Sequence, residues 1–225
     1  MNALGKIEAV TFDVGGTLIE PWPSVGHVYA AVAAENGLEG LSAETLNSNF
    51  AAAWRGRKNF DHSAAAWMKL VDQTFAGLAP VPPSRTFFPE IYRRFASGAA
   101  WRVFDDVVPA LSALRERRLK LAVISNWDER LGPLLRQLGL DRFFQAVVVS
   151  HAVGSPKPSP AIFLEAAARL GLATKKIMHL GDQEQEDIQG AAAAGLQALL
   201  IQRGGPSVRG RQIASLSELE SLFAN

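Results

Sequence analysis

The sequence predicts an α/β fold in which a doubly wound parallel sheet carries a helical domain inserted after its first strand. Short apolar runs rich in β-branched residues alternate with one-sided helical patterns through most of the chain. This alternation requires right-handed crossovers and puts helices on both faces of the sheet. Between residues 20 and 104 the alternation stops, and alanine-rich segments predict helices without a convincing strand.

Taken in chain order, the core elements begin with an apolar run that ends just before Asp13. Five runs have the length and composition of buried parallel strands: 7–12, 120–125, 146–150, 176–181 and 198–201. Three segments between them place apolar residues on one face of a helix: 107–114, 131–138 and 163–170. Residues 1–19 and 105–225 are therefore predicted to form the core domain.

The inserted segment, residues 20–104, is predicted to be a separate helical domain. Its helical patterns cover three stretches: 28–37, 44–56 and 63–78. Proline and glycine at both flanks are typical of linkers or hinges. Three tryptophans, Trp54, Trp67 and Trp101, are expected to pack these helices.

Composition excludes several classes of function. Lys and Arg total 23 against 22 Asp and Glu, a formal net charge of +1, so no broad field attracts nucleic acid or anionic lipid. The basic runs at 115–118 and 203–211 are short and are expected to be solvated surface. The chain has no cysteine, hence no disulfide and no thiolate site, and no apolar run long enough to span a bilayer. We expect a cytoplasmic protein with a small-molecule substrate, as a monomer or a homodimer.

Polar side chains gather at the carboxyl ends of the predicted strands, where open α/β sheets bind their ligands. Successive strands lead into the following residues: Asp13; Ser125 and Asn126; Lys157; Asp182 and Asp187. Because parallel strands end at one edge of the sheet, a carboxylate, a hydroxyl, an ammonium and two further carboxylates are predicted to converge there.

The order and spacing of these residues resemble the four motifs of the haloacid dehalogenase (HAD) hydrolases. The matching positions are Asp13 with Gly16 and Thr17, then Ser125, then Lys157, then Gly181-Asp182 with Asp187. The resemblance covers nearly the whole chain and implies a Rossmann-like core with a helical cap of the C1 type. It also implies an Asp nucleophile, so Asp13, Ser125 and Lys157 are the predicted catalytic residues.

A phosphate monoester is dianionic, so a carboxylate approaches it only where cations offset the repulsion. Hard oxygen ligands favour Mg²⁺, and Asp13 and Asp182 would supply them. The resemblance adds the backbone carbonyl of Gly15 as a third ligand. The predicted substrate-binding set is Gly16, Thr17, Ser125, Asn126 and Lys157. The expected reaction is hydrolysis of a small phosphorylated metabolite through an aspartyl-phosphate.

Gly15 departs from the family pattern, because phosphatases of the family use a second Asp there as general acid and base. General acid–base catalysis is worth about 10² to 10⁴ in rate. Three alternatives stay open: a leaving group that needs no proton, such as an acyl or aryl phosphate; a degenerate member that binds phosphate without turnover; or an acid from elsewhere. Candidates for the last are Glu20, Glu35, Asp61 and His62.

A further alternative is dehalogenation, since 2-haloacid dehalogenases of the family also lack the second Asp and need no metal. They carry Tyr at the position of Gly15, and Ser and Asn in the fourth motif. Here Asp182 stands in that motif, and its negative charge beside Asp13 favours a metal-dependent reaction.

Other polar residues are expected to be structural. Asp187 is predicted to orient its neighbours instead of binding metal, and Asn126 to cap the following helix as well as contact substrate. We expect Glu184 and Glu186 to be exposed to solvent. We expect His151 and His179 to be packed in or beside strands.

Overall fold

The computed structural model describes residues 7–58, 60–205 and 212–223, and its contacts divide the chain into two compact units. The first unit consists of Met1–Ile19 and Val103–Asn225, and the second of Glu20–Arg102. Each unit has its own buried core, and each is described by itself below.

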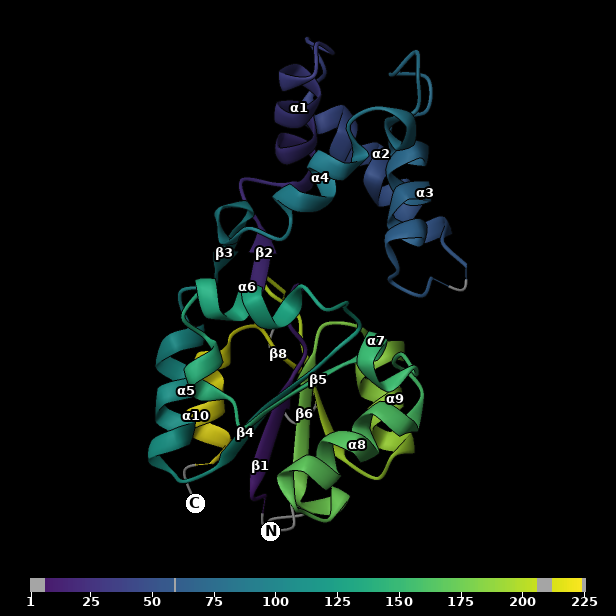
Figure 1. The fold of residues 1–225 in the computed structure, drawn as a ribbon. Helices are drawn as coiled ribbons and strands as arrows, with labels where there is room; N and C mark the ends of the chain where they lie inside the picture. The colour runs from purple at the N-terminus through teal and green to yellow at the C-terminus, as the bar shows by residue number, and fades with distance from the viewer. Residues whose placement is uncertain (1–6, 59, 206–211, 224–225) are drawn as a thin grey trace. The chain divides into compact units, whose positions relative to one another are not determined.

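The first unit is built on a six-stranded parallel sheet with the order β5-β4-β1-β6-β7-β8 (Figure 1). Its strands are β1 (Ala9–Phe12), β4 (Lys120–Ser125), β5 (Ala146–Val149), β6 (Ile177–Gly181), β7 (Gln197–Ile201) and β8 (Gln212–Ile213). The α/β fold and all five strands expected from the sequence are confirmed. The additional strand, β8, has only two residues, too few to show a pattern.

Helices cover both faces of this sheet, with α5 and α10 on one side and α8 and α9 on the other (Figure 1). Their bounds are α5 (Val107–Glu116), α6 (Leu131–Gln137), α7 (Ser150–Val153), α8 (Pro160–Leu170), α9 (Gly190–Ala193) and α10 (Leu219–Leu222). One turn, η5 (Glu184–Gln189), is a π-helix. The arrangement is the doubly wound layering that the strand–helix alternation predicts.

Burial of apolar faces holds these layers together. Helix α8 buries Ile162, Phe163 and Ala166 against Ile124 of β4 and Ile177 of β6. Its start is well defined, because Pro160 stands at its first position and the side chain of the preceding serine accepts a bond from a backbone N–H. The segment that carries Lys157 leads directly into this helix.

The second unit is a bundle of four α-helices with an aromatic core. The helices are α1 (Val25–Glu35), α2 (Ala43–Gly56), α3 (Ala64–Thr74) and α4 (Phe88–Arg94). A serine caps each of the first three helices. Tyr29 packs edge-on to Phe50, with ring centroids 6.1 Å apart. Trp54 stacks on Trp67 at 5.7 Å, and Trp101 packs against a phenylalanine, as expected for residues that fill this unit.

Two strands that the sequence did not predict stand where the chain passes between the units. They are β2 (Ile19–Pro21) and β3 (Trp101–Val103), which form a sheet of their own. The expectation that 20–104 holds no strand was therefore wrong at both ends. Three residues are too few for an alternating pattern, and Pro21 at the end of β2 reads as a linker.

The basic segments differ in their surroundings. Residues 115–118 are exposed, as expected. Of the run at 203–211, residues 206–211 lie outside the described part of the chain. Arg203 is half-buried instead of solvated, and its guanidinium lies 3.7 Å from the ring centre of Phe104. Within the described residues, no helix is both long and apolar enough to cross a bilayer.

Candidate active site

The strand order brings the predicted polar residues to one edge of the sheet. The central strand β1 pairs with β4 on one side and β6 on the other, so the ends of these three strands are neighbours. Asp13 follows β1 directly, and its backbone N–H donates to Leu180 of β6 (2.8 Å). Ser125 ends β4, and Asp182 follows β6. The chain adds β4 and β5 on one side of β1 and then β6, β7 and β8 on the other. The carboxyl end of β1 is therefore the topological switch point at which α/β sheets bind ligands.

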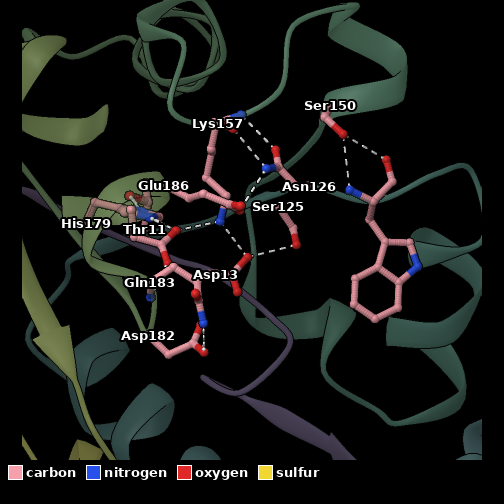
Figure 2. A network of polar contacts seen from close by, with 12 residues as sticks. Thr11, Asp13, Ser125, Asn126, Ser150, Lys157, His179, Asp182, Gln183 and Glu186 are labelled. Carbon is pink, nitrogen blue, oxygen red and sulfur yellow. Dashed lines mark hydrogen bonds and ion pairs between the residues drawn. The ribbon is translucent and has the colours of Figure 1, made fainter. Parts of the chain in front are cut away.

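Asp13, Ser125 and Lys157 form one buried group (Figure 2). The Ser125 hydroxyl donates to Asp13 Oδ1 at 2.9 Å, and the Lys157 ammonium donates to the same oxygen at 2.7 Å. The side chain of Asp13 is only 10% exposed and that of Lys157 only 2% exposed. A carboxylate is thus held between a hydroxyl and a cation at the site predicted for a nucleophile.

Asn126 fixes the backbone that carries Lys157. Its amide oxygen accepts from the Lys157 N–H at 2.7 Å, and its amide nitrogen donates to the Lys157 carbonyl at 3.1 Å. The expectation that Asn126 caps the next helix was wrong, because α6 begins six residues after Ser125 and has no side-chain cap. A long-range side-chain bridge has replaced the local cap.

Asp187, on the π-helical turn η5, completes the network beneath Lys157. Its Oδ1 accepts from the Lys157 ammonium at 2.5 Å and pairs with His179 Nε2 at 3.2 Å, while Oδ2 accepts from the Gln183 backbone at 3.0 Å. The His179 ring also contacts the Thr11 hydroxyl at 2.9 Å through Nδ1. Both oxygens of Asp187 are therefore engaged, and His179 is packed as expected.

Gly181 explains how Asp187 comes so close to the strand end. A Cβ at Gly181 would lie 2.1 Å from the Asp187 carboxyl carbon, a distance that no side chain can adopt. The glycine before Asp182 is thus required by the approach of the turn to β6.

Burial and mutual repulsion perturb the titration of these groups. Burial raises the pKa of Asp13, although Lys157 acts in the opposite direction. Burial and the charge of Asp13 raise the pKa of Asp182 to about 7. Burial would also raise the pKa of Asp187, but the Lys157 ammonium outweighs it and lowers that pKa well below its usual range.

The basic partners respond in opposite ways. Burial alone would lower the pKa of Lys157, yet Asp13 and Asp187 outweigh it and raise that pKa above its usual range. Burial lowers the pKa of His179, so the ring is neutral. A neutral His179 that donates a hydrogen bond from Nε2 to Asp187 accepts a hydrogen bond from the Thr11 hydroxyl at Nδ1.

The carboxylates form a cluster that suits a metal ion. Asp13, Asp182 and Asp187 each offer an oxygen, and these three atoms lie within 4.8 Å of one another. The buried Oδ1 of Asp182 has no hydrogen-bond partner among the described residues, whereas Asp187 has used both oxygens. Asp13 and Asp182 are thus the pair with capacity for a cation, and oxygen ligands favour a hard one.

The loop after β1 is shaped by close approach to Asp182. Gly16 has φ +76°, and a Cβ there would lie 2.6 Å from Asp182 Oδ2. The loop is closed by bonds from Gly16 N to the Ile19 carbonyl (2.8 Å) and from Ile19 N to the Val14 carbonyl (3.0 Å). These bonds do not involve the carbonyl of Gly15, the predicted third metal ligand.

Thr17 is buried in the same loop, and its hydroxyl has no partner among the described residues. Its carbonyl accepts from Arg203 Nη2 at 2.6 Å, and Arg203 also pairs with Asp106 at 3.0 Å. Sequence reasoning missed this arginine, since nothing in its local pattern distinguishes it from a solvated basic run.

The four candidate acids belong to the second unit, and each has its own surroundings there. Glu20 pairs with Arg102, and the exposed Glu35 pairs with Arg94 at 2.6 Å. Asp61 accepts from the backbone of Ser63. His62 is buried, with its ring edge-on to Phe60 at 4.9 Å between ring centres.

The expected burial of two residues, Glu186 and His151, was wrong. Glu186 is half-buried, and its Oε2 accepts from the Asn126 amide at 3.0 Å, whereas Glu184 is exposed as expected. His151 is exposed instead of packed, because it belongs to α7, which begins directly after β5.

Comparison with known proteins identifies the family. A model described as haloacid dehalogenase-like hydrolase matches residues 7–195. The chain belongs to this family. Haloacid dehalogenase-like hydrolase domain-containing protein 3 of Bos taurus is 34% identical over 207 residues, covering 87% of this chain and 82% of that protein. The glyceraldehyde 3-phosphate phosphatase of Methanopyrus kandleri is 42% identical over 102 residues, 45% of this chain and 44% of that one.

Solved structures agree on the fold of this HAD-like hydrolase. The HAD-hydrolase YfnB of Bacillus subtilis, crystallised bound to magnesium, has a TM-score of 0.78 at 20% identity, covering 98% of this chain and 100% of that one. Phosphatases and dehalogenases both occur among the similar structures. The HAD-like fold therefore leaves the choice between these activities to the site itself.

Proposed function

We propose that this HAD-like hydrolase is a Mg²⁺-dependent phosphatase that cleaves a small phosphorylated metabolite through an aspartyl-phosphate on Asp13. The observation that carries the proposal is the pair of the buried Asp13 and the half-buried Asp182, with an Asp182 oxygen that has no hydrogen-bond partner among the described residues. Two carboxylates this close repel each other, and the charge of Asp13 adds to burial in raising the pKa of Asp182 to about 7. A cation held by these residues would offset that repulsion.

Asp13 and Asp182, with the Gly15 carbonyl, would hold the ion. Bound Mg²⁺ would supply positive charge that offsets the repulsion between a carboxylate and a dianionic phosphoryl group. Lys157 contributes a second positive charge, already fixed on Asp13 and Asp187. Asn126 holds the backbone of that lysine, so little reorganisation is needed when substrate binds.

The reaction on these residues has two steps. A carboxylate oxygen of Asp13 attacks phosphorus, an O–P bond forms, and the ester P–O bond breaks with its electron pair on the leaving oxygen. Water then attacks the acyl phosphate on Asp13, which releases inorganic phosphate and restores the carboxylate. Ser125 and Lys157, which donate to Asp13 Oδ1 in this structure, would donate to phosphoryl oxygens of a bound substrate.

Gly15 limits the substrates of the first step. It has no side chain to protonate the leaving oxygen, a loss of about 10² to 10⁴ in rate for an alkoxide leaving group. Leaving groups that are stable as anions, such as a carboxylate or a phenolate, avoid this loss. We therefore place acyl and aryl phosphates ahead of alkyl phosphates.

The first experiment measures hydrolysis of acetyl phosphate and p-nitrophenyl phosphate with Mg²⁺ and with EDTA. We expect turnover only with the metal, and its loss in Asp13→Asn, which keeps the shape of the side chain and removes the nucleophile. Equal rates in Asp13→Asn and the unmodified protein would contradict the proposal. Tight phosphate binding without turnover on either substrate would instead assign a binding role.

The second experiment restores the acid. Apart from its chain neighbours, no atom of the described residues lies closer than 3.7 Å to a Cβ on Gly15, and the backbone there is not left-handed, so the loop accepts a side chain at this position. We expect Gly15→Asp to raise kcat/KM for glycerol phosphate by about 10² or more and to change acetyl phosphate far less. Gly15→Asn, of the same shape but without an acid, is the matched control. An equal gain on both substrates would remove the leaving-group argument.

Dehalogenation remains the second candidate because dehalogenases share the fold. The position of Asp182 speaks against it. A haloacid substrate brings no requirement for a cation, and Asp182 would then hold a buried charge beside Asp13 without compensation. Release of chloride from 2-chloropropionate in the presence of EDTA would favour dehalogenation over phosphate hydrolysis.

A further inference from the structure

The space that Gly15 leaves beside Asp13 is bordered by an aromatic ring. Apart from its chain neighbours, Cζ3 of Trp127, at 3.7 Å, is the only atom of the described residues within 4 Å of a Cβ built on Gly15. That distance is ordinary van der Waals contact. The edge of an indole thus lies where the family's second Asp would begin.

The backbone of Trp127 is anchored to the neighbouring strand end. Its N–H donates to the Ser150 hydroxyl at 3.1 Å, and the same hydroxyl donates to the Trp127 carbonyl at 3.1 Å. The backbone N–H of His151 donates to that carbonyl too, at 3.2 Å. Figure 2 shows both hydrogen bonds of the Ser150 hydroxyl, and Ser150 itself is buried. Trp127 is half-buried.

The location of the ring relates it to the leaving group. An acid at position 15 would act on the oxygen that departs from phosphorus, so a side chain there lies on the leaving-group side of the site. In this chain position 15 supplies no acid, and the edge of the Trp127 indole borders the space beside it. Its polarity therefore suits an apolar, planar leaving group and not a hydroxylated alkyl one.

We propose, on the basis of the function proposed above, that Trp127 is a specificity-determining residue that packs against an aromatic leaving group. The substrate class is then an aryl phosphate monoester. Two features agree on this class: Gly15 removes the acid that a phenolate does not need, because phenols ionise near pH 10, and Trp127 offers the ring on which the phenyl group packs. Acetyl phosphate satisfies only the first of these features.

Binding of phosphonates tests the proposal without turnover. Phenylphosphonate and methylphosphonate carry the same anion and differ in the ring, so calorimetric titration in Mg²⁺ isolates the aromatic contact. We expect the unmodified protein to prefer phenylphosphonate and Trp127→Leu to lose about tenfold of that affinity, the upper range for one aromatic pair. Methylphosphonate affinity should change less than about twofold, and Trp127→Phe should keep most of the preference.

Several results would overturn the proposal. These are equal affinity of the unmodified protein for the two phosphonates, no binding of either, or an equal loss of both in Trp127→Leu. Thermal melting of the variants identifies a folding defect, and Trp127→Phe provides the milder substitution if the leucine variant does not fold. A phenyl preference without hydrolysis of any phosphate ester would refute the catalytic proposal and with it the leaving-group role of Trp127, although the aromatic contact itself would stand. Hydrolysis without a phenyl preference would refute the Trp127 proposal alone.

Discussion

Removal of the Asp182 charge should stabilise the metal-free protein at alkaline pH. Asp182 is largely buried next to Asp13, and both effects raise its pKa to about 7, from 3.8 in the unfolded chain. The sign follows from linkage. Between these two pKa values the folded state holds a proton that the unfolded state has released, so each rise in pH favours unfolding. Above pH 7 both states are ionised, and the full cost of the buried charge remains.

The structure sets the size of this effect. The free-energy cost of the Asp182 charge grows over the two pH units from pH 5 to pH 7, by at most about 3 kcal/mol. Asp182 is partly open to solvent and accepts a bond from the Gln183 amide at 2.7 Å, which lessens the cost. We therefore expect Asp182→Asn to gain about 2 kcal/mol more at pH 8 than at pH 5. For a chain of this length that gain corresponds to roughly 4 to 8 °C in melting temperature.

The assay is urea or thermal unfolding in EDTA at both pH values. Glu184→Gln is the matched control, because Glu184 is an exposed acid two residues away. Adding Mg²⁺ should stabilise the unmodified protein at pH 8 and leave Asp182→Asn nearly unchanged. The reasoning would be refuted if Asp182→Asn were less stable than the unmodified protein at pH 8, or if Glu184→Gln gained as much.

Three other substitutions probe separate parts of the site. Gly16→Ala should abolish Mg²⁺ binding in calorimetry, because its Cβ would lie 2.6 Å from Asp182 Oδ2 and the backbone there is left-handed. Gly15→Ala is the control and should keep the Mg²⁺ affinity within about twofold. Lys157→Met should lower the free energy of unfolding by about 3 to 5 kcal/mol, because two buried carboxylates lose their partner. Lys175 is exposed, so the control Lys175→Met should change this free energy by less than about 0.5 kcal/mol. Asn126→Ala should weaken phosphate binding and cost about 1 to 3 kcal/mol in urea unfolding, and unchanged phosphate affinity would show that the lysine backbone needs no bridge.

The core fold was predictable because its signals are local. Parallel strands buried on both faces are continuous apolar runs, and the run at 120–125 matches β4 at both ends. Convergence of Asp13, Ser125 and Asp182 then follows from topology, since parallel strands that neighbour β1 end at one edge. The distances between these residues required the structure, because packing and not spacing decides them.

What the sequence did not predict depends on long-range contacts. The bridge from Asn126 to the Lys157 backbone joins segments that lie 31 residues apart. Arg203 reaches the Thr17 carbonyl across 186 residues. Neither residue stands in a pattern that shows its partner, and a local role, a cap or a solvated charge, is the commoner one for its type. Strands β2 and β3 were missed because three residues carry no periodicity.

The charges of the site argue for a cation from a direction independent of the family. Among the described residues at the sheet edge, the carboxylates of Asp13, Asp182 and Asp187 face a single ammonium, Lys157, while His179 is neutral. Lys157 satisfies Asp187, whose pKa is lowered, but leaves the other two raised. A nucleophile must be ionised to attack, and further positive charge beside Asp13 would favour its ionised form. A divalent ion held by Asp13 and Asp182 would supply that charge at oxygens that have capacity for it, and it would lower the raised pKa of Asp182. We therefore expect Mg²⁺ binding near pH 7 to release protons, and this release is the direct measure of the coupling.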